Sequence, residues 1–293
     1  MEIIRQLDLG EMIRIALAED VGQGDVTTAA TVAPGQAGRA RITVKEPGEI
    51  VFCGGFMFET VFAAAGGEPQ VLSLAREGAR LPHGAIAAEI KGRLAGLLIG
   101  ERVALNFVQL MSGIATATRH YIDAIAGSRA RIIDTRKTHP GLRALEKYAV
   151  RCGGGSNHRF GLDSGVLIKE NHIAAAGGVR SALERARALA PHTFRIQIEC
   201  ETLAQVEEAL AAGATSILLD NMTLDELREA RRITGDAVVL EASGGVTLDS
   251  VRAIAETGIN LISVGALTHS VKAADLSMRI EILYGEAKGA TQK

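Results

Sequence analysis

Three acidic residues end short apolar runs at a constant interval in the second half of the chain. They are Glu199, Asp220 and Glu241, and each lies 21 residues from the next. Carboxylates can hold Mg²⁺, directly or through water, and can also accept hydrogen bonds from sugar hydroxyls. Glu199 and Asp220 could alternatively do no more than balance the charges of Lys137 and Lys169.

A surplus of positive charge lies in the segment that precedes these acids. From Arg129 to Arg159 there are eight basic residues, with only Asp134 and Glu146 to oppose them. The whole chain carries a formal net charge of -2 and has a pI near 6.4. This balance excludes a general basic surface for nucleic acid or membrane and favours an anionic small molecule as ligand. A solvated basic helix face remains the simpler alternative.

Two glycine-containing turns follow the last two apolar runs of the chain. They contain Ser243, Gly244 and Gly245, and then Ser263, Val264 and Gly265. Backbone N–H groups in such turns, ahead of helix N-termini, bind phosphate well. Glycine is also common in tight turns for steric reasons, but two consecutive turns beside a cluster of Arg and Lys favour a phosphate site.

Repeated strand-then-helix units must position these residues. Six short apolar runs recur with a helical stretch after each, and Thr202, Thr223 and Thr247 are natural N-caps. Such units form a parallel sheet, and their nearly constant phase favours a barrel. Functional side chains of such barrels lie at the carboxyl ends of the strands. The predicted rim comprises Asp134, Thr135, Arg136, Lys137, Lys169, Glu199, Asp220, Glu241, Ser243 and Ser263.

The first half of the chain has a different pattern. We expect a helix over Leu7–Ala18, short strands at Gly38–Val44, Ile50–Cys53, Gln70–Leu74 and Ala85–Arg93, and a helix over Gly55–Ala65. This grouping favours a small α+β layer. A long helix is predicted from about Gly96 to Ala126, and Gly100 and Gly113 make a kink or break plausible within it.

The composition is that of an ordinary globular protein, with 47% hydrophobic and 23% charged residues. Three cysteines without C-x-x-C spacing predict neither a disulfide framework nor a thiolate zinc site. The N-terminal segment has no apolar signal region, and uninterrupted apolar stretches are too short to span a membrane. We therefore expect a cytoplasmic protein.

Seven ordered motifs resemble the quinolinate phosphoribosyltransferase family, whose members are decarboxylating nicotinate-nucleotide pyrophosphorylases. The resemblance runs through essentially the whole chain and includes the Gly24-Asp25-Val26-Thr27-Thr28 turn. The motifs are Glu101–Phe107, Asp134–Thr138, Asn157–Arg159, Leu167–His172, Ile198–Glu201, Leu218–Asn221 and Glu241–Gly245.

The resemblance implies an N-terminal α/β sandwich over 1–110, completed by 270–293, and an irregular, incomplete TIM-like α/β barrel over 111–269. It also implies a homodimer or larger assembly with a shared active site. The substrates would be quinolinate and phosphoribosyl pyrophosphate, used in NAD biosynthesis. Quinolinate would bind Thr135, Arg136, His158, Arg159, Lys169 and Arg102 of the partner subunit. Phosphoribosyl pyrophosphate would bind Lys137, Glu199, Asp220 and the turns Ser243–Gly245 and Ser263–Gly265, with Mg²⁺ near Glu199 and Asp220.

Three other functions stay open from the residues alone. A related phosphoribosyltransferase could act on another heterocycle, for example nicotinate. An aldolase-type lyase could form a Schiff base on Lys137 or Lys169. A barrel that only binds anions is disfavoured, because Glu199 and Asp220 would serve no purpose beside a phosphate.

Overall fold

The computed structural model describes residues 9–284, which form two compact units. One unit combines the chain up to Thr116 with the segment that begins at Val271, and the other is Ala117–Ser270. The division falls within α5 (Leu94–Ala124), the longest helix of the described residues. Each unit has its own sheet, and the two sheets differ in strand direction.

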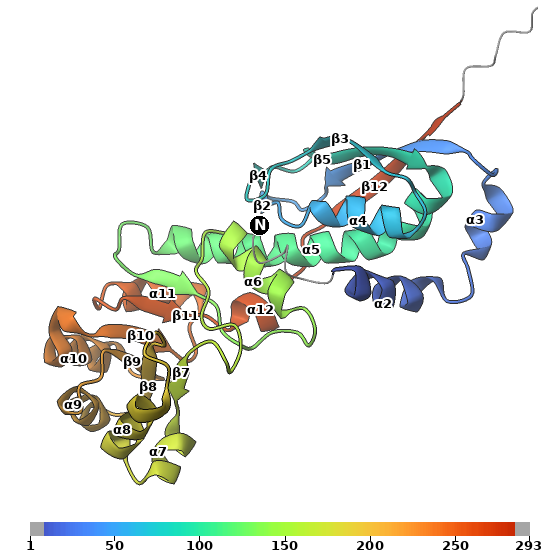
Figure 1. Cartoon of the computed structure of the whole chain (residues 1–293). Coiled ribbons are helices and arrows are strands. Elements are labelled where there is room, and N and C mark those ends of the chain that lie inside the picture. The colour runs from blue at the N-terminus through green and yellow to red at the C-terminus, as the bar shows by residue number, and fades with distance from the viewer. Residues whose placement is uncertain (1–8, 285–293) are drawn as a thin grey trace, which may run out of the picture. The chain divides into compact units, whose positions relative to one another are not determined.

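The first unit is built on an antiparallel sheet whose strand order is β12-β1-β5-β3. Alternation of buried and exposed residues along β1 gives the sheet one face toward the core. β12, from the C-terminal segment, pairs with β1 over eight residues, so distant parts of the chain lie side by side (Figure 1). The elements of this unit before α5 are α2 (Leu9–Val21), α3 (Val26–Thr31), β1 (Ala37–Val44), β2 (Ile50–Val51), α4 (Phe56–Ala64), β3 (Gln70–Leu74), β4 (Arg80–Leu81) and β5 (Ile86–Arg93); β12 is Leu276–Leu283.

The elements expected for the first half are confirmed, apart from shifts at their ends. The first helix runs to Val21, and the start predicted for it at Leu7 lies outside the described residues. Asp25 caps α3, because its carboxylate accepts hydrogen bonds from the backbone N–H groups of Thr27 and Thr28.

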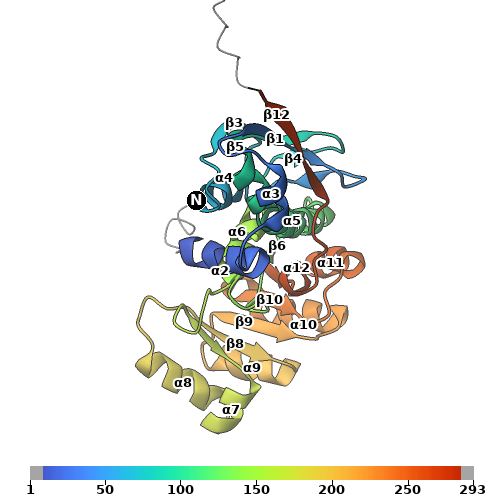
Figure 2. The same ribbon diagram turned by 90° about the vertical axis from the view of Figure 1, so that its right-hand side faces the viewer.

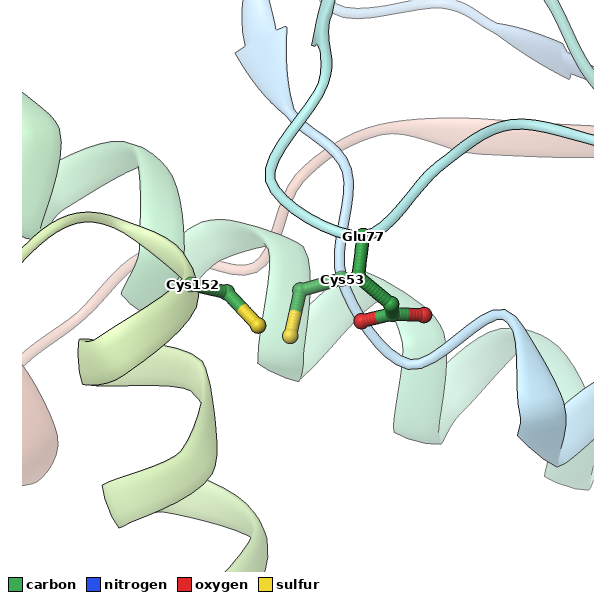
Figure 3. Close-up of side chains that lie close together, drawn as sticks. All are labelled: Cys53, Glu77 and Cys152. Atoms are coloured by element: carbon green, nitrogen blue, oxygen red, sulfur yellow. The ribbon is translucent and has the colours of Figure 1, made fainter. Parts of the chain in front are cut away.

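The turn after β2 is held by a carboxylate from a distant loop. Glu77 accepts hydrogen bonds from the backbone N–H groups of Gly54 (2.9 Å) and Gly55 (2.8 Å). Cys53, the preceding residue, exchanges two hydrogen bonds between its backbone and the hydroxyl of Ser112 on α5. Figure 3 shows Cys53 beside the Glu77 carboxylate. These contacts fix the start of α4 against α5.

The long helix α5 is unbroken, so the kink or break considered at its glycines is absent. Gly100 and Gly113 instead allow neighbours to approach closely. A Cβ at Gly100 would lie 2.8 Å from the Phe62 ring, and one at Gly113 would overlap the backbone oxygen of Lys272. By length and composition α5 could cross a membrane, but half of its most apolar stretch is buried, as in a core helix.

The second unit is a parallel sheet with strand order β6-β11-β10-β9-β8-β7. β6 and β7 are its edges and do not pair with each other, so the barrel is incomplete, as predicted. Helices α8 (Val179–Leu189) and α9 (Leu203–Ala211) pack against β8 (Figure 2). Helix α11 (Leu248–Ala255) packs against β11. The strands are β6 (Arg131–Ile133), β7 (Val166–Ile168), β8 (Ile196–Cys200), β9 (Ser216–Asp220), β10 (Val239–Ser243) and β11 (Leu261–Ser263).

Local sequence explains where several of these helices begin. Thr202, Thr223 and Thr247 each cap a helix, and each forms a reciprocal capping box with the residue three positions on. These three caps were predicted from the sequence. The helices are α6 (Arg143–Cys152), α7 (Glu170–Ala176), α8 (Val179–Leu189), α9 (Leu203–Ala211), α10 (Leu224–Thr234), the 3₁₀ turn η1 (Gly235–Ala237), α11 (Leu248–Ala255) and α12 (Ala266–His269).

Substitution of Gly113 by alanine should destabilise the protein, because the added methyl group has no room beside Lys272. We expect a loss of about 1–3 kcal/mol, as for overpacked sites. The measurement is urea unfolding followed by circular dichroism. Gly48→Ala is the matched control: that position is open, and its variant should stay within about 0.5 kcal/mol of the parent protein. Equal stability of the two variants would contradict the close approach at Gly113.

Candidate active site

A cavity of about 730 Å³ lies within the Ala117–Ser270 unit, at the carboxyl ends of the parallel strands. Thirteen of the residues predicted for the site line this cavity. They are Thr135, Arg136, Lys137, His158, Arg159, Lys169, Glu199, Asp220, Ser243, Gly244, Gly245, Ser263 and Gly265.

Two predicted residues are placed elsewhere. Val264 is buried beside the cavity, and its backbone N–H donates to the oxygen of Ile133 at 3.0 Å, so that N–H is not free for a phosphate. The assignment of Val264 to the phosphate site stays a prediction. Arg102 lies on α5 in the first unit, where it is exposed.

The strand register arranges the cavity side chains in layers. Glu199, Leu218 and Glu241 are partners across β8, β9 and β10, so they point to the same face of the sheet. Asp220 and Ser243 are also partners, and they form the next layer toward the strand ends. The three acids thus lie on three neighbouring strands, with Asp220 one layer nearer the strand ends than Glu199 and Glu241.

A buried ion pair holds the two cationic segments of the site together. Asp134 directly follows β6, and Lys147 lies on α6. Their side chains are almost fully buried, and Lys147 Nζ lies 2.5 Å from Asp134 Oδ1. The same carboxylate accepts hydrogen bonds from the His158 backbone N–H (2.8 Å) and from Asn157 Nδ2 (2.6 Å). Lys147 also donates to the backbone oxygen of His158 at 3.2 Å. The pair therefore fixes both the Arg136 turn and the His158 loop.

Burial and mutual attraction shift the pKa values of Asp134 and Lys147 in opposite directions. Burial raises the pKa of the Asp134 carboxyl, and the Lys147 ammonium opposes that rise. Burial likewise lowers the pKa of Lys147, and Asp134 opposes that fall. Each charge thus depends on the presence of the other.

Two arginines at one end of the cavity, Arg136 and Arg159, have hydrogen-bond donors without partners among the described residues. Arg159 donates from Nη1 to the backbone oxygen of Gly165 at 2.8 Å. The Nε atoms of Arg136 and Arg159 are buried and have no hydrogen-bond partner among the described residues. Burial, followed by the charge of Arg136, lowers the pKa of Arg159. Buried guanidinium nitrogens without partners indicate a site for an anionic ligand.

Another end of the cavity is lined by the two glycine-containing turns. Gly244 (φ 96°) and Gly245 (φ 57°) take left-handed conformations that L-residues rarely adopt. A Cβ at Gly244 would overlap the side chain of Asn221, which also has a positive φ. At the second turn, the side chains of Lys137 and His269 both approach Gly265. Asn221 and His269 line the cavity but were not predicted.

Glu199 and Asp220 form the acidic side of the cavity. Glu199 is paired with Lys169 at 3.2 Å, and Asp220 accepts a hydrogen bond from Asn221 Nδ2 at 2.8 Å. Two carboxylates without nitrogen or sulfur donors, next to a phosphate site, are a donor set that suits Mg²⁺. Cys200 follows Glu199 but faces the core, and burial raises the pKa of its thiol to about 12. Cys200 is therefore not a nucleophile of this site.

The fold and the cavity define an incomplete barrel that binds a small molecule with several negative charges. Residues 25–112 match the family "Quinolinate phosphoribosyl transferase, N-terminal domain", and residues 114–279 match the corresponding C-terminal domain. The chain belongs to the quinolinate phosphoribosyl transferase family.

Individual relatives support the same assignment. The probable nicotinate-nucleotide pyrophosphorylase (carboxylating) of Bacillus subtilis is 43% identical over 95% of this chain and 96% of its own length. The nicotinate-nucleotide pyrophosphorylase (carboxylating) of Mycobacterium leprae is 44% identical over 92% of this chain and 95% of its own. The crystal structure of NadC from Streptococcus pyogenes superposes with a TM-score of 0.90 at 39% identity, covering 94% of this chain and 97% of NadC.

Replacement of Lys147 by methionine should destabilise the fold strongly, because it leaves the Asp134 carboxylate buried without a counter-charge. We expect a loss of about 3–5 kcal/mol in urea unfolding, the usual cost of breaking a buried pair. The double variant Asp134→Asn/Lys147→Met should lose less than the sum of the two single variants. Additive losses would show that the two side chains are not coupled.

Proposed function

We propose that the protein transfers the phosphoribosyl group of phosphoribosyl pyrophosphate to the ring nitrogen of quinolinate, with decarboxylation. The products are nicotinate mononucleotide, pyrophosphate and CO₂, and the enzyme serves NAD biosynthesis as a pentosyltransferase. The observation that carries this proposal is the pair of buried guanidinium Nε atoms without partners, on Arg136 and Arg159. Two carboxylates on one small ring supply the missing acceptors.

The two ends of the cavity account for the two substrates. Quinolinate lies at the end formed by Thr135, Arg136, His158, Arg159 and Lys169. The 5-phosphate of phosphoribosyl pyrophosphate lies on the Ser243–Gly245 turn and at Ser263 and Gly265, where Lys137 adds a positive charge. Glu199 and Asp220 face the ribose hydroxyls, and they are also the residues that would hold Mg²⁺.

The chemistry uses few proton transfers. The pyridine nitrogen attacks C1 of the ribose with its lone pair, and the bond from C1 to pyrophosphate breaks with its electrons on the leaving group. Mg²⁺, when bound, would neutralise part of the negative charge on the leaving pyrophosphate. The ring becomes a pyridinium, which withdraws electrons from C2. The 2-carboxylate then leaves as CO₂, and C2 takes up a proton from water.

We further propose that the active enzyme is a homodimer or larger assembly in the cytoplasm. Arg102 is exposed on α5, which fits a residue that serves the site of another copy. In this assembly, quinolinate also contacts Arg102 of the partner subunit. This assignment rests on the family resemblance of the Glu101–Phe107 motif.

The lysine environments disfavour an aldolase. A Schiff-base lysine requires a desolvated amine, but Lys137 is exposed and Lys169 is half exposed and paired with Glu199. Borohydride should therefore trap no carbonyl substrate on either lysine.

Purified protein with quinolinate, phosphoribosyl pyrophosphate and Mg²⁺ should release labelled CO₂ and pyrophosphate in equal amounts. This stoichiometry follows from a transfer that is coupled to loss of one carboxylate. If pyrophosphate were released without CO₂ when nicotinate replaces quinolinate, the substrate would be a monocarboxylic acid. Release of neither product would contradict the proposed function.

Substitution of Arg136 or Arg159 by alanine should mainly raise the KM for quinolinate, because each change removes a charged partner of a ring carboxylate. We expect an increase of about 10–100-fold, equivalent to one charged hydrogen bond of about 1.5–3 kcal/mol. Steady-state kinetics with varied quinolinate provides the measurement. Arg228→Ala is the control, since that arginine is exposed on α10 and pairs with Asp225. An unchanged KM in the Arg136 and Arg159 variants would exclude them from the quinolinate site.

A further inference from the structure

One acidic residue of the cavity has no role in the function described above. Glu241 lies in the middle of β10, lines the cavity, and has a side chain only 2% exposed. Its Oε2 accepts a hydrogen bond from Gln197 Nε2 at 2.8 Å. Its Oε1 is buried without a hydrogen-bond partner among the residues that the structure describes. Burial of a carboxylate oxygen without a hydrogen-bond partner costs free energy, unless a bound ligand offsets that cost.

The protein itself does not neutralise this carboxylate. No Lys or Arg nitrogen of residues 9–284 lies within 4.0 Å of it, whereas Glu199 has Lys169 at 3.2 Å. The neighbouring basic group is His158, whose Nε2 is 3.8 Å from Glu241 Oε2. His158 Nδ1 accepts a hydrogen bond from the backbone N–H of Arg159 at 2.8 Å. Glu241 therefore has no Lys or Arg counter-charge among the residues that the structure describes.

The position of Glu241 lies between the two ends of the cavity. On one side it is near His158, in the end that would hold the pyridine ring. On the other side it precedes Ser243 by two residues on the same face of β10, below the turn that would hold the phosphate. The bond between the ring nitrogen and C1 must form between these two ends.

Positive charge develops where the bond between the ring nitrogen and C1 forms. As the bond from C1 to pyrophosphate breaks, its electron pair leaves with pyrophosphate and C1 gains cationic character. As the nitrogen lone pair forms the new bond to C1, the positive charge passes to the pyridinium ring. A fixed negative charge near the place where positive charge develops stabilises the transition state more than it stabilises the bound substrate. It therefore lowers the barrier of the reaction.

We propose that Glu241 supplies the counter-charge for the cationic ribosyl and pyridinium groups formed in the reaction. The quinolinate ring carries two negative charges and no positive charge before reaction, so Glu241 repels the substrate and attracts the product ring. This inference rests on the proposed function, because only that reaction creates a pyridinium in the cavity.

Glu241→Gln tests the proposal, since it keeps the size of the side chain and removes the charge. We expect kcat to fall by about 10–100-fold, as for loss of other preorganised electrostatic groups. The dissociation constant of quinolinate, measured by calorimetry, should stay unchanged or decrease. A residue that only supports the fold would weaken substrate binding together with turnover. Weaker quinolinate binding, with or without a fall in kcat, would therefore overturn the proposal. Glu207→Gln, the same change on the exposed face of α9, is the matched control.

A binding measurement separates the charge from catalysis. Nicotinate mononucleotide has a cationic ring, and its dihydro form has a neutral ring of nearly the same shape. The parent protein should bind the cationic form more tightly, and Glu241→Gln should reduce that preference by about tenfold, which corresponds to 1.4 kcal/mol. Glu241→Asp keeps the charge and should retain a preference.

The outcomes distinguish this proposal from the proposed function. If the parent protein releases CO₂ and pyrophosphate but Glu241→Gln keeps full turnover, only the role of Glu241 is wrong. If the parent protein shows no preference for the cationic ring, the proposal fails without any variant. If the parent protein does not turn over quinolinate at all, the proposed function itself fails.

Discussion

The buried pair between Asp134 and Lys147 is the contact on which the anion site depends. Asp134 directly follows the edge strand β6, and the residues after it form the turn with Arg136 and Lys137. The same carboxylate binds Asn157 and the backbone of His158, next to Arg159. Two cationic segments that would repel each other are thus held side by side by one carboxylate and one ammonium group. The energetic cost of burying this pair is offset by a preorganised site for a dianion.

The distribution of charge across the cavity fits a reaction that moves charge and transfers few protons. Unsatisfied guanidinium groups lie at one end, and glycine-rich turns with Lys137 lie at the other. Glu199 and Asp220 lie where the ribose and a metal ion would bind. Between the ends lies Glu241, whose Oε1 has no hydrogen-bond partner among the described residues. Electrostatic arrangements of this kind can supply most of the rate enhancement without an acid–base pair.

Much of this fold could be predicted from local sequence, and what could not depends on tertiary contacts. Thr202, Thr223 and Thr247 marked the helix starts through their own chemistry, and the spacing of the acids indicated parallel strands. Lys147 looked like part of a basic surface, since nothing local shows that its helix turns it toward Asp134. Asn221 gave a signal that was missed, because asparagine after a strand tolerates the positive φ observed there. The role of β12 followed from the family resemblance alone, because strand pairing between distant segments leaves no local pattern.

A crystal structure of the protein with quinolinate tests the central claim most directly. The account predicts that both ring carboxylates bind in the cavity of the Ala117–Ser270 unit, at Arg136, Arg159 and Lys169, while the Ser243–Gly245 turn stays free for the phosphate of the second substrate. Quinolinate bound at the glycine turns, or outside this cavity, would contradict the account.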